Sequence, residues 1–251
     1  MIPNMEVEIA GVKWKNPVTV ASGTFGSGME YGEFVDLNKL GAITSKGVAI
    51  YPWEGNATPR VAETPSGMLN AIGLQNPGME VFKNRDIPFM KKYDTVSIVN
   101  VVGKSAEEYI QAVEALSDTD VDMLEINISC PNVKEGGIAF GTDKDVAAAL
   151  TKEIKAHAKQ PVIMKLSPNV TSISEMAKAV EAAGADALSL INTITGMKID
   201  VERQSIFLAN KTGGLSGPAI RPVAVRMVYE VAHSVNIPII GMGGITCASD
   251  A

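Results

Sequence analysis

The sequence predicts an α/β fold built on a parallel sheet, a (β/α)8 or TIM barrel, in a single domain spanning residues 1–251. Short apolar runs alternate with helical patterns and no obvious linker interrupts them, as in parallel α/β sheets. The alternative, a doubly wound dinucleotide fold, needs Gly-x-Gly-x-x-Gly after its first strand, and Gly23, Gly26 and Gly28 do not have that spacing. Polar residues also recur where five strands end, which is where a barrel builds its active site.

The predicted elements follow one another in regular order. An opening hairpin is predicted from residues 7–9 and 12–14 around a turn at Ala10-Gly11. Seven strands come next, over residues 18–21, 42–45, 95–100, 123–127, 162–166, 187–191 and 238–241. Helices are predicted over residues 30–40, 79–92, 105–116, 143–157, 172–183 and 221–235, with Ser105 and Thr142 suited to N-cap positions.

The last residues, Ser249-Asp250-Ala251, have the pattern of a helix start in which Ser249 or Asp250 is the N-cap. A (β/α)8 barrel needs an eighth strand between its first and seventh strands, and the pattern predicts only seven. We therefore expect a C-terminally incomplete barrel that lacks its eighth βα unit. The competing expectation is a complete domain in which the opening hairpin or another segment closes the barrel.

Charge and composition narrow the classes of function. The net charge of −6 argues against a nucleic-acid surface, which needs clustered Lys and Arg. No apolar run reaches the length of a membrane span, and the first residues lack a signal-peptide pattern, so we expect a cytoplasmic protein. Two cysteines and two histidines are too few for a disulfide framework or a structural zinc site.

Lys and Asn side chains mark the ends of five predicted strands. These residues are Lys46, Asn100, Asn127, Lys165 and Asn192. Asn offers a donor and an acceptor and Lys offers three donors, a combination that suits the imide edge of a flat heterocycle and an anion. Gly241-Met242-Gly243-Gly244 follows the seventh strand, where backbone amides can bind a phosphate, although an ordinary tight turn fits nearly as well.

Cys130 lies just past the fourth predicted strand, at the catalytic face of a barrel. Cysteine is often a small buried hydrophobe, but a thiol with a pKa of roughly 8.5 acts as a base where its surroundings favour thiolate. Cys247, His157 and His233 are interpreted as structural because no motif surrounds them. Gly103-Lys104-Ser105 lacks the earlier glycine of a phosphate loop, which argues against a nucleoside triphosphatase.

Taken together, the motifs resemble those of one family, the dihydroorotate dehydrogenases. Similar stretches occur in order along the whole chain: residues 21–26 (ASGTFG), 44–47 (TSKG), 70–78 (NAIGLQNPG), 127–132 (NISCPN), 191–193 (INT) and 243–244 (GG). The stretches around Asn70 and Cys130 are specific in combination, whereas the glycine pairs are weak singly. A cysteine at the position of the base, where other members carry serine, resembles the class 1 enzymes and their NAD-linked subclass in particular.

The resemblance implies a barrel that holds FMN and oxidises dihydroorotate to orotate in pyrimidine biosynthesis. Cys130 is then implied to remove the C5 proton while hydride leaves C6 for the flavin, with Lys165 near the flavin N1 to O2 edge. The implied FMN contacts are Ser22, Lys46, Gly47, Asn100, Asn127, Lys165, Ile191, Gly217, Gly243 and Gly244. The implied substrate contacts are Lys46, Asn70, Ala71, Ile72, Gly73, Leu74, Asn127, Asn132, Asn192 and Thr193.

Resemblance to the NAD-linked subclass also implies an electron-transfer subunit carrying FAD and a two-iron cluster, in a heterotetramer of two of each chain. The two cysteines of this chain are fewer than the four thiolates that such a cluster ordinarily needs. Composition and residue spacing do not exclude the fumarate-linked members of the family, which are homodimers. They also leave two other classes open: an FMN barrel acting on another dihydropyrimidine, as in dihydropyrimidine dehydrogenase, and a non-catalytic barrel that binds a phosphorylated ligand.

Overall fold

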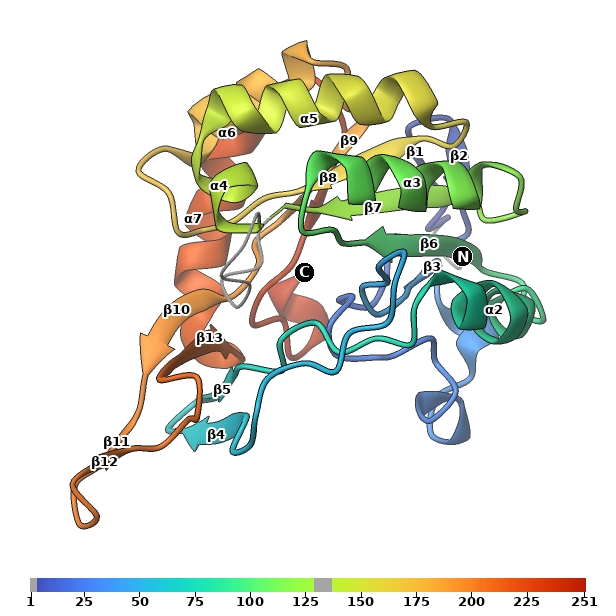
Figure 1. Ribbon diagram of the computed structural model, residues 1–251. Coiled ribbons are helices and arrows are strands. Elements are labelled where there is room, and N and C mark those ends of the chain that lie inside the picture. Colours follow the sequence, from blue (N-terminus) through green and yellow to red (C-terminus); the bar gives the residue numbers. More distant parts are fainter. Residues whose placement is uncertain (1–3, 129–136) are drawn as a thin grey trace.

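The computed structural model describes residues 4–128 and 137–251, and at its centre lies a curled parallel sheet (Figure 1). Six strands pair in the order β3-β6-β7-β8-β9-β14, so successive strands of the chain are neighbours in space. They are β3 (Ala42–Thr44), β6 (Val96–Val101), β7 (Met123–Asn127), β8 (Val162–Lys165), β9 (Ala187–Leu190) and β14 (Ile239–Gly241). The α/β class and the second to seventh predicted strands are confirmed.

The predicted first strand is shorter than expected. Residues 18–21 run parallel to β3 but form a single bridge, from Thr19 to Ala42, and the hydroxyls of Thr19 and Thr44 lie 3.1 Å apart. The pairing is short because the chain turns at once, with the Thr24 amide donating to the Ala21 carbonyl. Among the described residues, no strand pairs with the outer edge of β14, so the sheet is open there.

The opening hairpin is confirmed as β1 (Val7–Ile9) and β2 (Val12–Trp14). Its two turn residues, Ala10 and Gly11, have φ values of 51° and 81°, the positive values that a tight two-residue hairpin turn requires. Trp14 at the end of β2 is only 2% exposed and packs against side chains of the central sheet. The hairpin therefore covers the amino end of the sheet.

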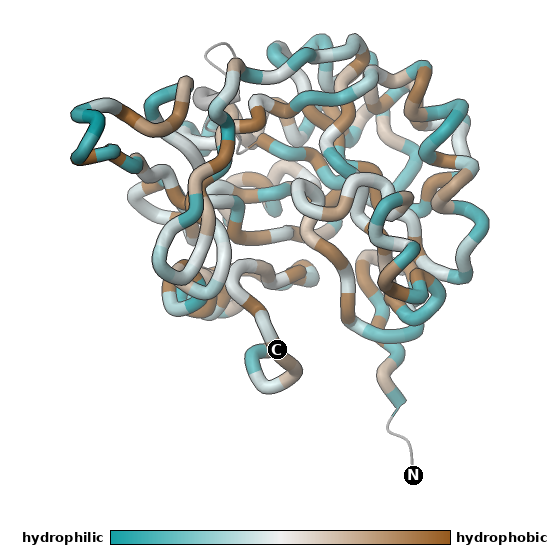
Figure 2. The backbone as a smooth tube through the Cα atoms, turned by 90° about the horizontal axis from the view of Figure 1, so that it is seen from below, coloured by the Kyte–Doolittle hydropathy of each residue, from teal (hydrophilic) through white to brown (hydrophobic). Residues whose placement is uncertain are grey.

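Four long helices pack on the outer face of the sheet. They are α3 (Ala106–Ser117), α5 (Lys144–His157), α6 (Ile173–Ala182) and α7 (Arg221–Ala232). Outward-facing strand residues such as Leu124 and Met164 join Leu116 and Ile154 of the helices in one large core. Figure 2 shows hydrophobic segments gathered inside and hydrophilic ones on the outer turns, as amphipathic elements require. None of the helices in the described ranges has the length and apolar character needed to cross a bilayer.

The expected N-cap Ser105 is confirmed, because its hydroxyl accepts a hydrogen bond from the Glu108 amide at 3.3 Å. The expected N-cap Thr142 is wrong, since Thr142 is the last residue of α4 (Gly137–Thr142). Asp143 caps α5 instead, and one of its carboxylate oxygens accepts from the amides of Asp145 and Val146. A carboxylate suits this position because it also complements the positive end of the helix dipole.

The helix predicted over residues 30–40 is wrong. The structure has two separate 3-10 turns there, η1 (Tyr31–Glu33) and η2 (Leu37–Lys39). The Asp36 carboxylate accepts a hydrogen bond from the Asn38 amide, a local bond that competes with continued helix formation. This segment therefore leads to β3 as turns instead of as a helix.

Two other helical segments differ in detail from the prediction. Residues 79–92 are helical as α1 (Met79–Val81), a π-helical turn η3 (Phe82–Asp86) and α2 (Ile87–Met90), and Pro88, which has no amide hydrogen, follows the wide turn. The chain ends in a 3-10 turn, η5 (Ala248–Asp250), whose N-cap is Cys247 and not Ser249 or Asp250. Hydrogen bonds from Thr246, together with Arg221, hold the pKa of the Asp250 carboxyl below its ordinary value.

The sequence pattern did not predict a second, antiparallel sheet, which lies at the lower left of Figure 1. Its strands pair in the order β10-β13-β5-β4, with bounds Ile194–Met197, Thr212–Ser216, Gly67–Asn70 and Val61–Thr64. A two-stranded hairpin, β11 (Ile199–Asp200) and β12 (Ser205–Ile206), projects beyond it, and η4 (Pro218–Ile220) follows β13. The connections after β3 and β9 thus meet in one sheet.

Candidate active site

The inward-facing side chains of the central sheet form two layers, because alternate residues of a strand point to the same face. The layer nearer the amino ends is apolar and packs on Trp14; it consists of Ala42, Ile98, Met123, Ile163, Ala187 and Ile240. Two residues further along five of these strands, the side chains are polar and buried; they are Thr44, Asn100, Glu125, Lys165 and Ser189. A buried polar layer therefore lies above an apolar one, toward the carboxyl ends of the strands.

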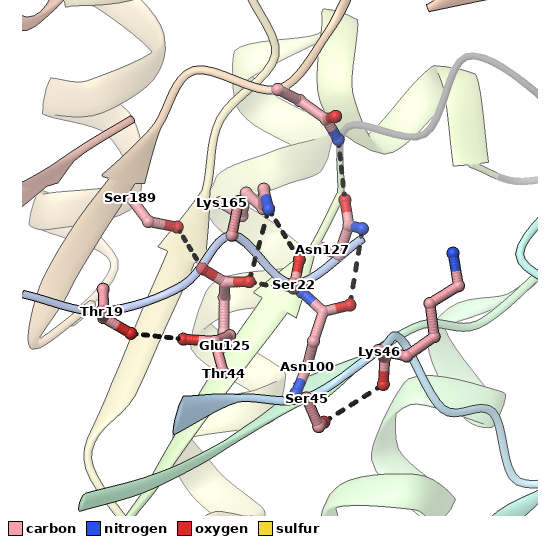
Figure 3. Close-up of polar contacts among 12 residues, drawn as sticks. Thr19, Ser22, Thr44, Ser45, Lys46, Asn100, Glu125, Asn127, Lys165 and Ser189 are labelled. Carbon is pink, nitrogen blue, oxygen red and sulfur yellow. Dashed lines mark hydrogen bonds and ion pairs between the residues drawn. The ribbon is translucent and has the colours of Figure 1, made fainter. Parts of the chain in front are cut away.

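Glu125 of β7 is the centre of the polar layer (Figure 3). Asn100 of β6 donates from Nδ2 to Oε1 at 2.5 Å, and Ser189 of β9 donates from its hydroxyl to Oε2 at 2.8 Å. The ammonium of Lys165 in β8 lies 3.6 Å from Oε1. Both carboxylate oxygens thus have partners, which a charge that is 2% exposed requires.

Lys165 connects this layer to the segment that precedes β3. Its Nζ donates to the hydroxyl of Ser22 at 2.7 Å, and its side chain is 5% exposed. The 3.6 Å separation from Glu125 is an ion pair but exceeds hydrogen-bond length. Within the described residues, the Ser22 hydrogen bond is the one that the ammonium donates, so two of its three N–H groups have the capacity to donate to an anionic ligand.

A chain of carboxamides leads out of the buried layer. Asn127 donates from Nδ2 to Asn100 Oδ1 at 3.5 Å and accepts at Oδ1 from Asn192 Nδ2 at 3.4 Å. The Asn192 oxygen in turn accepts from the Thr193 amide at 2.8 Å. The Asn127 carbonyl accepts from the hydroxyl of Tyr109 in α3 at 2.8 Å, which fixes the end of β7. Four of the predicted site residues are therefore in contact, in a row.

Lys46 and Gly47 follow β3 beside the same layer. The Lys46 amide donates to the Gly26 carbonyl at 2.7 Å, and the half-buried side chain extends to the level of Asn127 in Figure 3. A Cβ at position 47 would lie 2.8 Å from Asn100 Oδ1, so a larger residue would displace that carboxamide. Lys46 therefore places a cation at one edge of the site, and Gly47 lets the backbone lie close to Asn100.

Three predicted glycines meet beside Ile191. Gly217, Gly243 and Gly244 have φ values of 97°, 123° and 77°, which favour glycine. A Cβ on Gly244 would lie 2.9 Å from the Gly217 oxygen, and one on Gly243 would lie 3.5 Å from Ile191 Cγ1. In the described part of the chain, the amides of Gly243 and Gly244 donate no hydrogen bond. Two adjacent amides without acceptors form a cradle that fits a phosphate.

The antiparallel sheet brings the Asn70 stretch to Thr193. Asn70 donates from Nδ2 to the Gly214 carbonyl at 3.3 Å, and a Cβ on Gly214 would collide with the Thr193 side chain. The stretch continues through Ala71, Ile72, Gly73 and Leu74, and the last two have positive φ values of 75° and 54°. The residues predicted to hold substrate thus come from two connections, residues 70–74 from the one after β3 and residues 192–193 from the one after β9. The antiparallel sheet brings the two connections together.

The two remaining predictions, Cys130 and Asn132, lie outside the described residues. Four buried or half-buried residues were not predicted: Thr44, Glu125, Ser189 and Asn169. Asn169 bridges the connection after β9, donating to the Thr193 carbonyl and accepting from the Thr195 amide, both at 3.0 Å. Glu125 had a signal in the sequence, because it stands two residues before Asn127 on an otherwise apolar strand and so faces the same way.

A cavity of about 650 Å³ opens at the other end of the strands, beneath the hairpin. None of the predicted site residues lines it. Four of its charged side chains form ion pairs, Lys15 with Asp94 at 2.7 Å and Lys91 with Asp122 at 3.2 Å. The candidate site is therefore the polar layer and the loops above it, at the carboxyl ends.

Comparison with known proteins gives a consistent result. Residues 4–251 match the family described as "Dihydroorotate dehydrogenase". A protein of Lachnoclostridium phytofermentans is 68% identical over 248 residues, covering 99% of this chain and 83% of that protein. One of Alkaliphilus metalliredigens is 60% identical over 248 residues, with 99% and 82% covered, and one of a Geobacillus species is 57% identical over 247 residues, with 98% and 79% covered. Each of the three is named "Dihydroorotate dehydrogenase B (NAD(+)), catalytic subunit".

Proposed function

The chain belongs to the dihydroorotate dehydrogenase family, and from this premise we propose that it oxidises dihydroorotate to orotate in pyrimidine biosynthesis, as an enzyme of the NAD-linked type. The observation that carries the proposal is the 68% identity to a named catalytic subunit across 99% of the chain. The buried polar layer at the carboxyl ends of the strands supports it, because that is the catalytic end of a barrel.

The reaction removes a proton from C5 of dihydroorotate and a hydride from C6, leaving a C5–C6 double bond. We assign the proton to the Cys130 thiolate, which follows β7 in the sequence and lies outside the described residues. Within residues 4–128 and 137–251 the free cysteine is Cys247, which is exposed and far along the sequence from β7. A thiolate is a competent base near neutral pH without a histidine partner.

A flavin, which we take to be FMN, supplies the hydride acceptor when it is bound. The residues present fit such a group: Lys165 has unused donors, the Asn100 and Asn127 carboxamides lie on the two preceding strands of the sheet, and the amides of Gly243 and Gly244 lack acceptors. The proposed FMN contacts are Ser22, Lys46, Gly47, Asn100, Asn127, Lys165, Ile191, Gly217, Gly243 and Gly244. Lys165 would face the N1 to O2 edge, and the glycines would hold the phosphate.

The substrate carries an imide edge and a carboxylate, and its binding needs both amide groups and a cation. We propose that Lys46 neutralises its charge and that the carboxamides of Asn70, Asn127 and Asn192 hydrogen-bond its polar edges. The full proposed set is Lys46, Asn70, Ala71, Ile72, Gly73, Leu74, Asn127, Asn132, Asn192 and Thr193. The row of contacts from Asn100 through Asn127 to Asn192 supports the proposal that flavin and substrate bind next to each other on these carboxamides.

The relatives are named catalytic subunits, which implies a partner subunit. We propose that this partner is an electron-transfer subunit carrying FAD and a two-iron cluster, in an assembly of two of each chain, and that it passes electrons to NAD. Its presence would be tested by copurification: a yellow-brown partner of fixed stoichiometry supports the proposal, and a chain that reduces fumarate alone argues against it.

The reaction itself is tested by anaerobic mixing of the purified flavin-bound protein with dihydroorotate, followed by flavin absorbance. We expect bleaching with dihydroorotate and none with dihydrouracil. Cys130→Ser should keep FMN and orotate binding but lose most of the bleaching rate near neutral pH, because a hydroxyl is a far weaker base. Cys247→Ser is the matched control and should react at the wild-type rate. An undiminished bleaching rate in Cys130→Ser would show that Cys130 is not the base.

A further inference from the structure

Glu125 is a buried carboxylate that the reaction described above does not use. It is 2% exposed, and it lies two residues before Asn127, in the same layer as the proposed flavin contacts Asn100 and Lys165. Side chains of three other strands reach it: Asn100 at 2.5 Å, Ser189 at 2.8 Å and Lys165 at 3.6 Å. A buried charge is costly unless it is paired and hydrogen-bonded, so its retention at this place calls for a physical reason.

The contacts of Glu125 differ in kind. Its hydrogen bonds come from the neutral donors Asn100 and Ser189, which hold the carboxylate in position. Lys165 contributes an ion pair that is longer than a hydrogen bond, while its short bond goes to Ser22 at 2.7 Å. Glu125 therefore balances the lysine charge without occupying the lysine donors, which stay directed to the ligand side.

We propose that Glu125 is a positioning residue that holds the Lys165 ammonium at the flavin edge and limits how strongly this charge favours the reduced flavin. The inference rests on the proposed function, because it assumes that Lys165 contacts a bound flavin. Electrostatic interactions are strong in a buried site, where little water screens them. Removing the carboxylate charge leaves the lysine charge uncompensated, and the equilibrium shifts toward the negatively charged reduced flavin.

The test is the two-electron midpoint potential of the bound flavin, measured by dye equilibration without substrate. Glu125→Gln keeps an oxygen for Asn100 and an amide for the Ser189 hydroxyl, so it removes the charge with little change of shape. We expect a rise of about 30 mV or more, which is a tenfold change in the oxidised-to-reduced equilibrium. Glu125→Asp, which keeps the charge but moves it away from Lys165, should give a smaller rise.

Glu114→Gln is the matched control, because it removes a carboxylate charge from an exposed ion pair with His157 and leaves Glu125 and Lys165 in place. Its potential should stay near the wild-type value. An unchanged potential in Glu125→Gln would overturn the inference and leave Glu125 a purely structural residue. If that variant does not fold, an unchanged potential in Glu125→Asp has the same consequence. Wild-type protein that binds no flavin would overturn the proposed function as well, whereas a reactive wild type with unshifted variants would overturn only this inference.

Discussion

The two ends of the central sheet are built on the same strands and have opposite chemistry. At the amino end, Met123 and Ile163 pack with Trp14 of the hairpin in an apolar cluster. Two residues further along the same strands, Glu125 and Lys165 form a buried ion pair. Alternate side chains of a strand face inward. Whether an inward-facing side chain is apolar or polar depends on how near it lies to the amino or the carboxyl end of the strand.

The apolar layer serves the stability of the fold, and the polar layer, a few ångströms away, serves its activity. The apolar layer stabilises the fold in proportion to the surface it buries, with no polar atom to satisfy except the Trp14 indole nitrogen, which has no partner among the described residues. The polar layer adds little net stability, because the desolvation of Glu125 and Lys165 offsets their attraction. Substitutions in the two layers should therefore have distinguishable consequences. One substitution in each layer tests this, and one at the edge of the polar layer and one outside both layers sharpen the comparison.

The largest effect should come from Lys165→Met, which leaves Glu125 buried without its counter-ion. We expect the free energy of unfolding to fall by about 4 kcal/mol, and flavin binding to be lost. Urea denaturation measures the first and flavin retention through gel filtration the second. Lys155→Met is the matched control, since Lys155 pairs with Asp186 near the surface, where such a pair contributes about 1 kcal/mol or less. Equal losses in both variants would contradict the polar-layer argument.

Met123→Ala, in the apolar layer, should reduce stability without affecting flavin binding. Removing a fully buried side chain there should reduce the unfolding free energy by about 3 kcal/mol through lost burial and a residual cavity. The dissociation constant of FMN should stay the same for the protein that remains folded. Met123→Leu, which nearly conserves volume, should cost less than about 1.5 kcal/mol. A specific loss of FMN affinity would show that the two layers are not separable.

Lys46→Ala should affect ligands more than stability, because the side chain is half-buried at the edge of the polar layer. Charge-assisted hydrogen bonds contribute about 1.5–3 kcal/mol each, so the dissociation constants of orotate and FMN should each rise roughly 10- to 150-fold. Isothermal titration measures both. Unchanged constants would mean that Lys46 only extends its aliphatic stem along the strand end.

The smallest of the four effects should come from Ser105→Ala, outside both layers. The Ser105 hydroxyl caps α3 by accepting from the Glu108 amide, and its loss should cost about 1 kcal/mol of unfolding free energy. Flavin reduction by dihydroorotate should be unchanged. Ser105→Asp, which retains a capping acceptor, should recover most of the loss, and failure to do so would assign the effect to another cause.

The sequence was sufficient for the parts of the fold that depend on local pattern. The strand over residues 123–127 and the hairpin bounds agree with the structure because a short apolar run and a two-residue turn are local signals. The strand-end positions of Asn127 and Lys165 followed from the same pattern. What failed were features set by competing local bonds, as in the Asp36 turn that replaces a helix over residues 30–40.

Other features were unpredictable because they depend on long-range pairing. The β5 and β13 strands are short and contain glycine, so their pairing has no period-2 signal, and they depend on contacts with each other and with β4 and β10. Glu125 and Ser189 were missed for a related reason: the pattern of one strand indicates which way a residue faces, but the partners of these two follow from the register that aligns Lys165 with Ser189 and Asn100 with Glu125. Register between strands is set by the whole sheet.

The pairing of Asn70 with Gly214 also has a consequence for the order in which the molecule is assembled. The two residues are 144 positions apart, and the ribosome needs about 7 to 30 s to synthesise that length at roughly 5–20 residues per second. Throughout that time the early strands β4 and β5 exist without the later strand that covers them. The wall formed by the Asn70 stretch is therefore among the last parts of the site to take shape, and a nascent chain that already contains β3 to β8 has no finished pocket with which to capture its ligand.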